Sequence, residues 1–164
     1  MSLIYRKPQL DDGQRIHKMV LAAGTLDINS AYLYYLLADH FRDTVVLAES
    51  ADGTLLGFVT AYRPPNNPHH LFIWQIAVAP AARGQGIGSG LLKALLQRPF
   101  MTDIQRIDCT ITSNNTASLS LFRHLAALLK RPLIRQPYLS AEQLDGAHAA
   151  EDLYSIKLQE PLPG

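Results

Sequence analysis

The sequence predicts a mixed α/β fold in which helices flank a central sheet. Three observations favour this class. An almost wholly apolar run at residues 71–79 leads through a glycine-rich turn into a helical pattern that begins at Ile87. Two β-rich runs flank Asp52-Gly53, which is a strong signal for a β-hairpin. Residues 104–112 read as another buried strand and are again followed by a helical pattern, and alternating strands and helices are typical of α/β sheets.

The first part of the chain predicts two helices and the hairpin. An aspartate at 11–12 caps a helix that runs to about Ala23 and ends at Gly24. A loop follows, and then a short helix capped by one of the polar residues 29–30. The hairpin comes next, and a stiff proline turn separates it from the central strand.

The remaining elements alternate in type. The strand at 71–79 is apolar almost throughout, which is typical of a central strand covered on both faces. The further elements, in chain order, are a helix from Ile87 to Pro99, a buried strand at 104–112, a helix ending near Leu129, a polar loop to about Glu151, and a last strand at 153–158. The expected order of elements is α-α-β-β-β-α-β-α-β-β. A chain of 164 residues is long enough for one domain, 1–164, with its core over about residues 3–158.

Composition narrows the classes of protein. The formal net charge is +1, with no basic stripe, which argues against a nucleic-acid partner. Cys109 is the only cysteine, so no internal disulfide can form, and no Cys/His spacing suggests a metal site. The N-terminus lacks the apolar core of a signal peptide, and no apolar run approaches the ~20 residues of a membrane span. We therefore expect a soluble cytoplasmic protein without a membrane partner.

The glycine turn predicts an anion site. Gly84, Gly86 and Gly88 stand between a strand and a helix N-terminus, where free N–H groups and the helix dipole favour negative charge. A P-loop is excluded because Leu92 precedes the Lys93 that would have to follow a glycine. A dinucleotide-binding loop is excluded because its third glycine would fall on a serine or a leucine.

The stretch Arg83-Gly-Gln-Gly-Ile-Gly88, preceded by Val78-Ala-Pro80, resembles the acyl-CoA signature of the GNAT acetyltransferase superfamily. This resemblance implies the GNAT acyltransferase fold, with a mixed central sheet, splayed strands and flanking helices. It implies that amides of about residues 84–89 hold the pyrophosphate of acetyl-CoA and that the strand edge at 76–78 pairs with the pantetheine arm. The implied contacts are Ile76, Ala77, Val78, Arg83, Gly84, Gln85, Gly86, Ile87, Gly88 and Ser89.

A second superfamily motif lies on the following helix. Asn115 keeps the position that commonly contacts the pantetheine or the CoA. Phe122 occupies the place where many members carry the tyrosine that protonates the leaving thiolate, and a phenyl ring cannot donate a proton. Many members also place a glutamate on the central strand, whereas this strand carries Trp74 and Gln75. The general base must therefore come from elsewhere.

Stretches at 26–32, 61–65 and 72–78, with Gly146-Ala-His148, closely resemble the L-2,4-diaminobutyrate acetyltransferases of ectoine biosynthesis. The resemblance covers about residues 5–157. It implies N4-acetylation of L-2,4-diaminobutyrate by acetyl-CoA, through direct transfer in a ternary complex. By family analogy the protein is a homodimer. Two alternatives stay open: an acetyltransferase of another small diamine or amino acid, and a non-catalytic acyl-CoA-binding module.

The acceptor carries two ammonium groups and one carboxylate, so carboxylates must recognise it. Asp27 and Glu151 are the candidates, both for binding and for catalysis, although Asp27 could simply form a turn and Glu151 could be a solvated charge. Trp74 is expected to point away from its neighbour Gln75 and to form a wall of the acceptor pocket or to belong to the core. The other candidates for substrate binding are Tyr32 and His148, which could equally be a packing residue and a plain loop histidine.

Overall fold

The computed structural model describes residues 2–158. The chain divides into two compact units. Unit 1 consists of residues 1–62 and 73–101, and unit 2 of residues 63–72 and 102–164. The expectation of a single domain stays a prediction, and each unit is described by itself.

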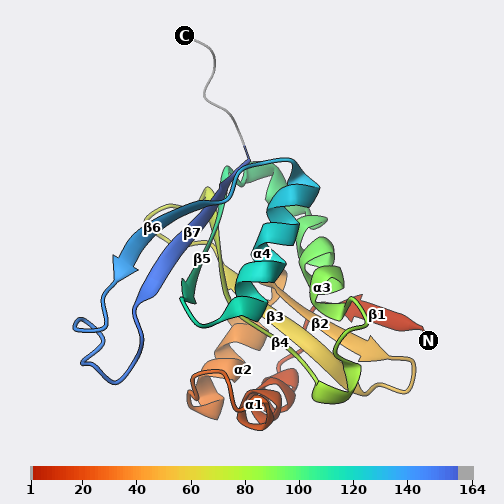
Figure 1. Ribbon diagram of the computed structural model, residues 1–164. Helices are drawn as coiled ribbons and strands as arrows, with labels where there is room; N and C mark the ends of the chain where they lie inside the picture. Colours follow the sequence, from red (N-terminus) through yellow and green to blue (C-terminus); the bar gives the residue numbers. More distant parts are fainter. Residues whose placement is uncertain (1, 159–164) are drawn as a thin grey trace. The chain divides into compact units, whose positions relative to one another are not determined.

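Unit 1 combines a sheet with three helices (Figure 1). Its neighbouring strands follow the order β1-β2-β3-β4, and both β1 with β2 and β2 with β3 are antiparallel. Helices α1 and α2 lie side by side. The bounds are β1 Leu3–Arg6, α1 Asp12–Ala23, α2 Ala31–His40, β2 Val45–Ser50, β3 Leu55–Tyr62, β4 His70–Val78, of which residues 73–78 lie in this unit, and α3 Ile87–Leu96; short 3-10 turns occupy Arg42–Thr44 and Pro80–Ala82.

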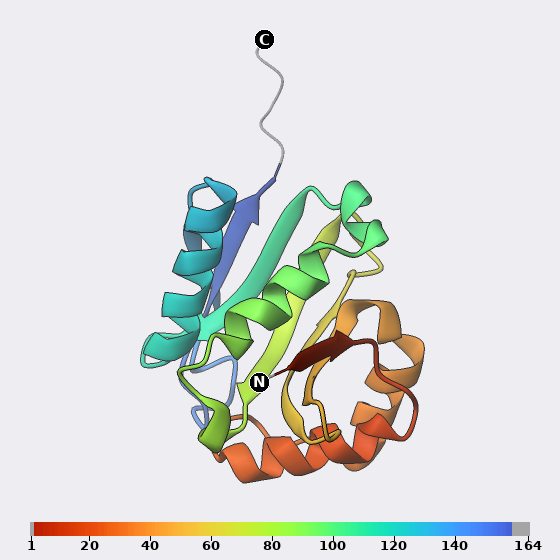
Figure 2. The ribbon, with the colours of Figure 1, turned by 90° about the vertical axis from the view of Figure 1, so that its right-hand side faces the viewer.

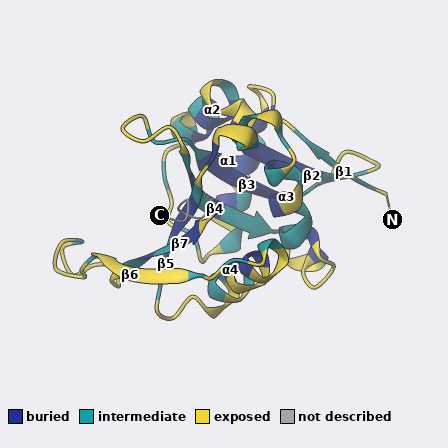
Figure 3. Cartoon of the chain, turned by 90° about the horizontal axis from the view of Figure 1, so that it is seen from above, coloured by how far each residue is buried: buried dark blue, intermediate teal, exposed yellow. Residues whose placement is uncertain are grey.

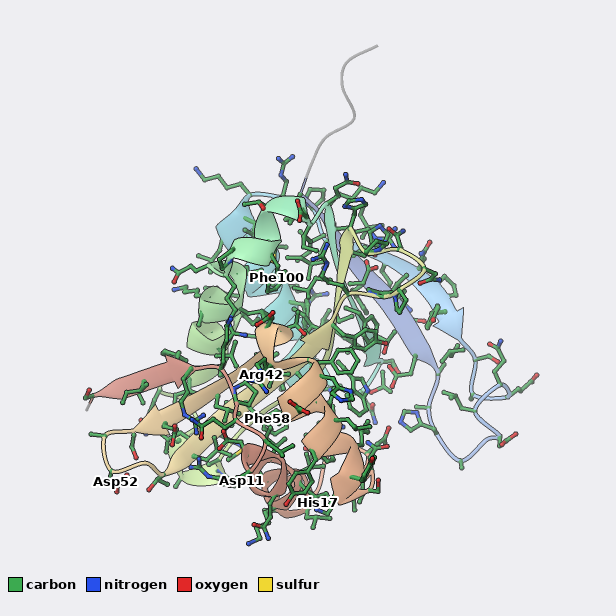
Figure 4. The ribbon with its side chains drawn as sticks, turned by 180° about the vertical axis from the view of Figure 1, so that it is seen from behind. Asp11, His17, Arg42, Asp52, Phe58 and Phe100 are labelled. Carbon is green, nitrogen blue, oxygen red and sulfur yellow. The ribbon has the colours of Figure 1, made fainter. Side chains whose placement is uncertain are left out.

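The helices of unit 1 cover both faces of its strands. Leu47 and Phe58 are directly paired on β2 and β3 and share one face, where they pack with residues of α1 and α2. Gly57 directly precedes Phe58 on β3 and faces the opposite side of the sheet. A side chain at Gly57 would meet Ile87 and Leu91 of α3. Figure 2 shows α3 running across these strands, and Figure 4 shows Phe58 and the α1 residue His17 on the α1–α2 side.

An ionic network fixes the N-terminus of unit 1. Arg6 binds the Asp12 carboxylate through two nitrogens, at 2.8 and 2.9 Å, and also binds Glu49. Arg15 reaches both carboxylates, at 3.0 Å and 3.3 Å. Burial raises the pKa of Asp12, but hydrogen bonds from Arg6, the Gln9 amide and Arg15 together bring it below its usual range. Arg6 likewise lowers the pKa of Glu49.

This network predicts an acid-sensitive contribution to stability. A carboxyl group whose folded pKa is lowered stabilises the fold above its unfolded pKa, about 3.9 for Asp and 4.3 for Glu, and loses that contribution as the pH falls through the folded value. The variant Asp12→Asn/Glu49→Gln should lose about 2–3 kcal/mol of unfolding free energy at pH 7. Its stability should also fall less steeply than the wild type's between about pH 5 and pH 2. Urea unfolding at several pH values measures both effects.

The control for this network is Asp43→Asn. Asp43 pairs with Lys7 at 2.9 Å on the surface, where an ion pair contributes about 0–1 kcal/mol. Parallel stability curves for the wild type and Asp12→Asn/Glu49→Gln across this pH range would contradict the assignment.

Unit 2 is built on β5 (Arg106–Thr112), α4 (Thr116–Leu129), β6 (Ile134–Leu139) and β7 (Glu151–Lys157). Its neighbouring strands follow the order β4-β5-β7-β6, in which β4 is represented by its first residues. The pairing of β4 with β5 is parallel over three residues, His70–Phe72 with Arg106–Asp108. The other two pairings, β5 with β7 and β7 with β6, are antiparallel. A 3-10 turn spans Pro99–Asp103 at the division between the units.

Most predicted elements are confirmed, and Figure 3 shows β2 and β3 as the buried strands of unit 1. The expected order missed β1, which the sequence offers only as Leu3-Ile-Tyr-Arg6, too short to register as a strand without its partner β2. Strand β7 begins at Glu151, two residues before the expected start at residue 153. Among residues 2–158, no helix is long and apolar enough to cross a membrane, and no three His, Cys, Asp or Glu side chains gather as metal ligands.

Candidate functional site

The glycine turn of unit 1 joins β4 to α3 (Figure 2). After the 3-10 turn, residues 83–86 are exposed, and the first helical hydrogen bond runs from the Gly90 amide to the Gly86 carbonyl, at 2.9 Å. The first amides of a helix have no acceptor within the helix, so those of residues 87–89 are available to an anion at this end. The Arg83 side chain folds back to the Val78 carbonyl, at 3.3 Å.

Backbone conformation explains two of the three glycines. Gly84 and Gly86 both have φ of +78°, in the left-handed region where other residues are strained. A Cβ at either position would meet no atom within 4 Å, so space does not require glycine there. Gly86 forms the N-cap of α3, and Ile87 behind it is buried. The open turn, with its helix N-terminus, is suited to a pyrophosphate, which needs several amides and no side chain in the way.

Asp27 lies in an exposed loop between α1 and α2 in unit 1. Its backbone carbonyl accepts hydrogen bonds from the side-chain amides of Gln75, at 3.3 Å, and Asn29, at 3.4 Å. Gln75 is buried on β4, and its Oε1 accepts from the Tyr34 hydroxyl at 2.9 Å. The loop that carries the Asp27 carboxylate is therefore tied to the core of unit 1.

Trp74 and Tyr32 occupy different surroundings in unit 1. Trp74 is half-buried and stacks on the Tyr34 ring, with 6.5 Å between ring centroids. It packs against the core cluster of unit 1, whose buried residues are Ile16, Val20, Tyr34, Leu37, Val45, Leu47 and Phe58. Both Trp74 and its neighbour Gln75 thus reach Tyr34, whereas simple alternation along the strand predicted separate surroundings. Tyr32, at the start of α2, is 71% exposed, so its ring is available to a ligand.

In unit 2, Asn115 is the N-cap of α4, and its Oδ1 accepts from the Ser118 amide at 3.1 Å. This hydrogen bond gives Asn115 a structural role and leaves its predicted contact with CoA a prediction. Phe122 is buried on α4. Cys109 is buried on β5, and burial raises the pKa of its thiol, which disfavours the reactive thiolate form.

The structure brings His148 and Glu151 together in unit 2. Glu151 is the first residue of β7 and pairs with Thr112 of β5. The His148 Nε2 atom lies 3.9 Å from a Glu151 carboxylate oxygen, and the His148 Nδ1 atom lies 2.8 Å from the Ala149 carbonyl oxygen. A carboxylate beside an imidazole can accept a proton and can share it with its neighbour.

Sequence reasoning missed three residues of unit 1: Tyr34, Gln75 as a hydrogen-bonding residue, and Asn29 as more than a helix cap. The available signal was Gln75 itself, because a polar side chain in an otherwise apolar central strand requires hydrogen-bond partners. Ser30, and not Asn29, is the N-cap of α2.

Comparison with known proteins gives a consistent family. A model of the acetyltransferase (GNAT) family matches residues 15–126. The L-2,4-diaminobutyric acid acetyltransferase of Chromohalobacter salexigens is 44% identical over 160 residues, 98% of this chain and 83% of that protein. The enzyme of the same name from Halomonas elongata is 43% identical over 154 residues, 94% of this chain and 80% of that protein.

A solved structure extends the comparison. The diaminobutyrate acetyltransferase of Paenibacillus lautus, in complex with its substrate L-2,4-diaminobutyric acid and coenzyme A, superposes with a TM-score of 0.93 at 36% identity, covering 99% of each chain. The chain therefore belongs to the acetyltransferase (GNAT) family and, within it, to the L-2,4-diaminobutyric acid acetyltransferases.

Proposed function

We propose that the protein transfers the acetyl group of acetyl-CoA to N4 of L-2,4-diaminobutyrate, giving N4-acetyl-L-2,4-diaminobutyrate as an early step towards ectoine. The observation that carries this proposal is the likeness to the Paenibacillus lautus enzyme, whose structure holds this substrate and coenzyme A. The left-handed Gly84 and Gly86 at the start of α3 support it, because they form the open turn that the acyl-CoA signature requires.

The residues of unit 1 supply binding for the donor. We infer that the amides of residues 84–89 hold the pyrophosphate of acetyl-CoA, beside the exposed Arg83 and Gln85. Residues 76–78 follow the part of β4 that pairs with β5, and they are candidates to pair with the amide-rich pantetheine arm as a further strand would. For Asn115 and Phe122 of α4, in unit 2, contact with CoA stays a prediction from the superfamily motif.

The acceptor needs an unprotonated N4, although an amine with a pKa near 10.4 is almost wholly an ammonium ion at pH 7. We infer that Glu151, oriented by His148, takes this proton and that Asp27 binds an ammonium group. Trp74 forms an apolar wall, and Tyr32 is the candidate partner of the substrate carboxylate.

Direct transfer follows from these roles. After Glu151 has taken one proton from the N4 ammonium group, the N4 lone pair attacks the thioester carbonyl carbon, and the C–N bond forms as the C–S bond breaks. The attacking nitrogen releases its second proton to solvent, and CoA leaves as a thiolate that gains a proton. Phe122 has no proton to give, so water or another group supplies it. The buried Cys109 is unsuited to carry an acetyl group, because burial raises the pKa of its thiol. We therefore expect intersecting initial-rate patterns, as in a ternary complex, and not the parallel lines of a ping-pong mechanism.

Thiol release from acetyl-CoA across a panel of amines tests the function. Turnover should be highest with L-2,4-diaminobutyrate, and mass spectrometry should place the acetyl group on N4. Faster turnover with ornithine or spermidine would favour an acetyltransferase of another small amine. Saturable CoA binding without turnover of any amine would favour a non-catalytic acyl-CoA-binding module.

Asp27→Asn should raise the KM for diaminobutyrate by about 10- to 100-fold, because a hydrogen bond to a charged group contributes about 1.5–3 kcal/mol. The KM for acetyl-CoA should stay within about twofold, since the variant leaves the glycine turn unchanged. Steady-state kinetics with each substrate varied in turn measures both constants. The matched control is Asp39→Asn, whose carboxylate pairs with Arg42 on the surface of the same unit, at 2.7 Å. Equal effects of the two variants would refute the role of Asp27.

We further propose that the protein is a cytoplasmic homodimer. Strand β6 supports the dimer: it ends the strand order of unit 2, and it exposes Ile134 and Tyr138. An edge strand of this kind presents backbone groups that can pair with another chain. A cytoplasmic location follows from the use of acetyl-CoA by a biosynthetic enzyme. Light scattering after size exclusion measures the oligomeric state, and a mass of one chain at micromolar concentration would contradict the dimer.

A further inference from the structure

A chain of hydrogen bonds runs from the core of unit 1 to the loop that carries Asp27. The Tyr34 hydroxyl donates to Gln75 Oε1 at 2.9 Å, and Gln75 Nε2 donates to the Asp27 carbonyl at 3.3 Å. The Asn29 side-chain amide lies 3.4 Å from both the Asp27 carbonyl and the Tyr34 hydroxyl oxygen. Tyr34 and Gln75 are buried, whereas Asp27 is exposed. These hydrogen bonds thus link the buried core of unit 1 to the exposed loop that carries Asp27.

The direction of every hydrogen bond in this chain is determined. The Asp27 carbonyl can only accept, so Gln75 must present its NH2 group to it and turn Oε1 towards Tyr34. The Tyr34 hydroxyl must then donate to Gln75, and its lone pairs are left to accept from Asn29. A network with one consistent set of donors and acceptors holds its members in one arrangement.

The buried residues of this hydrogen-bond chain, Gln75 and Tyr34, are held by further contacts with Thr60 and with two aromatic rings. The backbone amide of Gln75 donates to Thr60 Oγ1 at 3.2 Å, and this hydroxyl donates in turn to the Gln75 carbonyl at 3.4 Å. The Tyr34 ring stacks on Trp74 and lies 5.6 Å from the His17 ring, tilted by 33°. Tyr34 and Gln75 therefore cannot shift without disturbing β3, β4 and both helices of the core cluster.

We propose that Tyr34 and Gln75 are positioning residues for acceptor binding, which fix the backbone of Asp27 so that its carboxylate meets an ammonium group of the diamino acid. This inference rests on the proposed function of Asp27. In a loop fixed only at its two ends, the position of the Asp27 carboxylate would vary. A misplacement of about 1 Å can lower the rate by a factor of about 10². Tyr34 also stacks on Trp74, the proposed wall of the acceptor pocket. The buried pair Tyr34–Gln75 therefore positions both the Asp27 loop and the Trp74 ring.

A double-mutant cycle tests the inference. Tyr34→Phe keeps the ring and its stacking but removes the hydroxyl. It should raise the KM for L-2,4-diaminobutyrate about five- to twentyfold and leave the KM for acetyl-CoA within about twofold. In an Asp27→Asn background the same change should add less than about twofold, because Tyr34 acts through Asp27. Additive effects, or equal increases in both KM values, would overturn the inference.

Two further variants separate positioning from folding. Thr44→Val removes another buried hydroxyl of unit 1, one that donates to the Ala61 carbonyl at 2.5 Å, and should lower the melting temperature without changing the KM for diaminobutyrate. Asn29→Ala removes the second donor to the Asp27 carbonyl from a half-buried position and should raise that KM about two- to fivefold even if Tyr34→Phe does not fold. An unchanged KM in Asn29→Ala, or a raised one in Thr44→Val, would overturn the inference. If the wild-type protein itself fails to acetylate diaminobutyrate, the proposed function falls, and the inference falls with it.

Discussion

Replacing Glu151 by glutamine is expected to lower kcat for diaminobutyrate by about 10²- to 10³-fold, because a positioned general base contributes about 10²–10⁴ to the rate. Glutamine keeps the size of the side chain and its place at the start of β7 but cannot take a proton at neutral pH. The KM for acetyl-CoA should change little, since the glycine turn of α3 is unaltered. Thiol release under saturating substrates measures kcat directly.

The adjacent residue offers a matched control for this prediction. The Asp152 side chain is 19% exposed against 20% for Glu151, and its carboxylate binds Arg135 at 2.7 Å. Asp152→Asn therefore removes a charge from the same strand of unit 2, at nearly the same exposure. If this variant loses as much kcat as Glu151→Gln, the loss reflects damage to β7 and the assignment of the base to Glu151 is wrong.

The same comparison explains why Glu151 could be proposed from sequence only through a resemblance. Glu151 and Asp152 are consecutive acidic residues before an apolar run, and nothing in the pattern separates them. The structure separates the two residues, because the His148 ring lies near the Glu151 carboxylate, whereas the Asp152 carboxylate forms an ion pair with Arg135. Arg135 lies on β6, far from Asp152 in the sequence, and although His148 stands only three residues before Glu151, the sequence does not show which of the two carboxylates its ring approaches.

Local signals predicted most of the fold because they act over a few residues. Gly24 ends α1 in a left-handed conformation, and Asp52-Gly53 turns β2 into β3, as each pattern indicated. Strand β1 escaped because its four residues gain their structure from β2, about forty residues along the chain. The Tyr34–Gln75–Asp27 network escaped for the same reason, since it joins a helix, a strand and a loop.

The glycine turn supports the second prediction of large effect. In Gly84→Ala/Gly86→Ala, two residues with φ of +78° gain a Cβ, and the left-handed conformation then costs about 1–2 kcal/mol at each position. Without acetyl-CoA, the turn of this variant can relax to other conformations. Binding of acetyl-CoA must then restore the left-handed conformation, and the free energy that this requires weakens the binding. The KM for acetyl-CoA should therefore rise by about 10²-fold, while the KM for diaminobutyrate stays within a few-fold.

The matched control for this variant lies in the same unit. Gly24 and Gly53 also have left-handed backbones, with φ of +69° and +85°. A Cβ would find open space at Gly24 and only one carboxylate oxygen, 4.0 Å away, at Gly53. Gly24→Ala/Gly53→Ala should thus lose stability and keep its KM for acetyl-CoA. Similar KM values for acetyl-CoA in the two double variants would mean that the left-handed turn at residues 84 and 86 serves only the fold. The binding site for acetyl-CoA would then lie elsewhere. A rise confined to Gly84→Ala/Gly86→Ala would separate the part of the glycine pattern that serves the pyrophosphate from the part that only turns the chain.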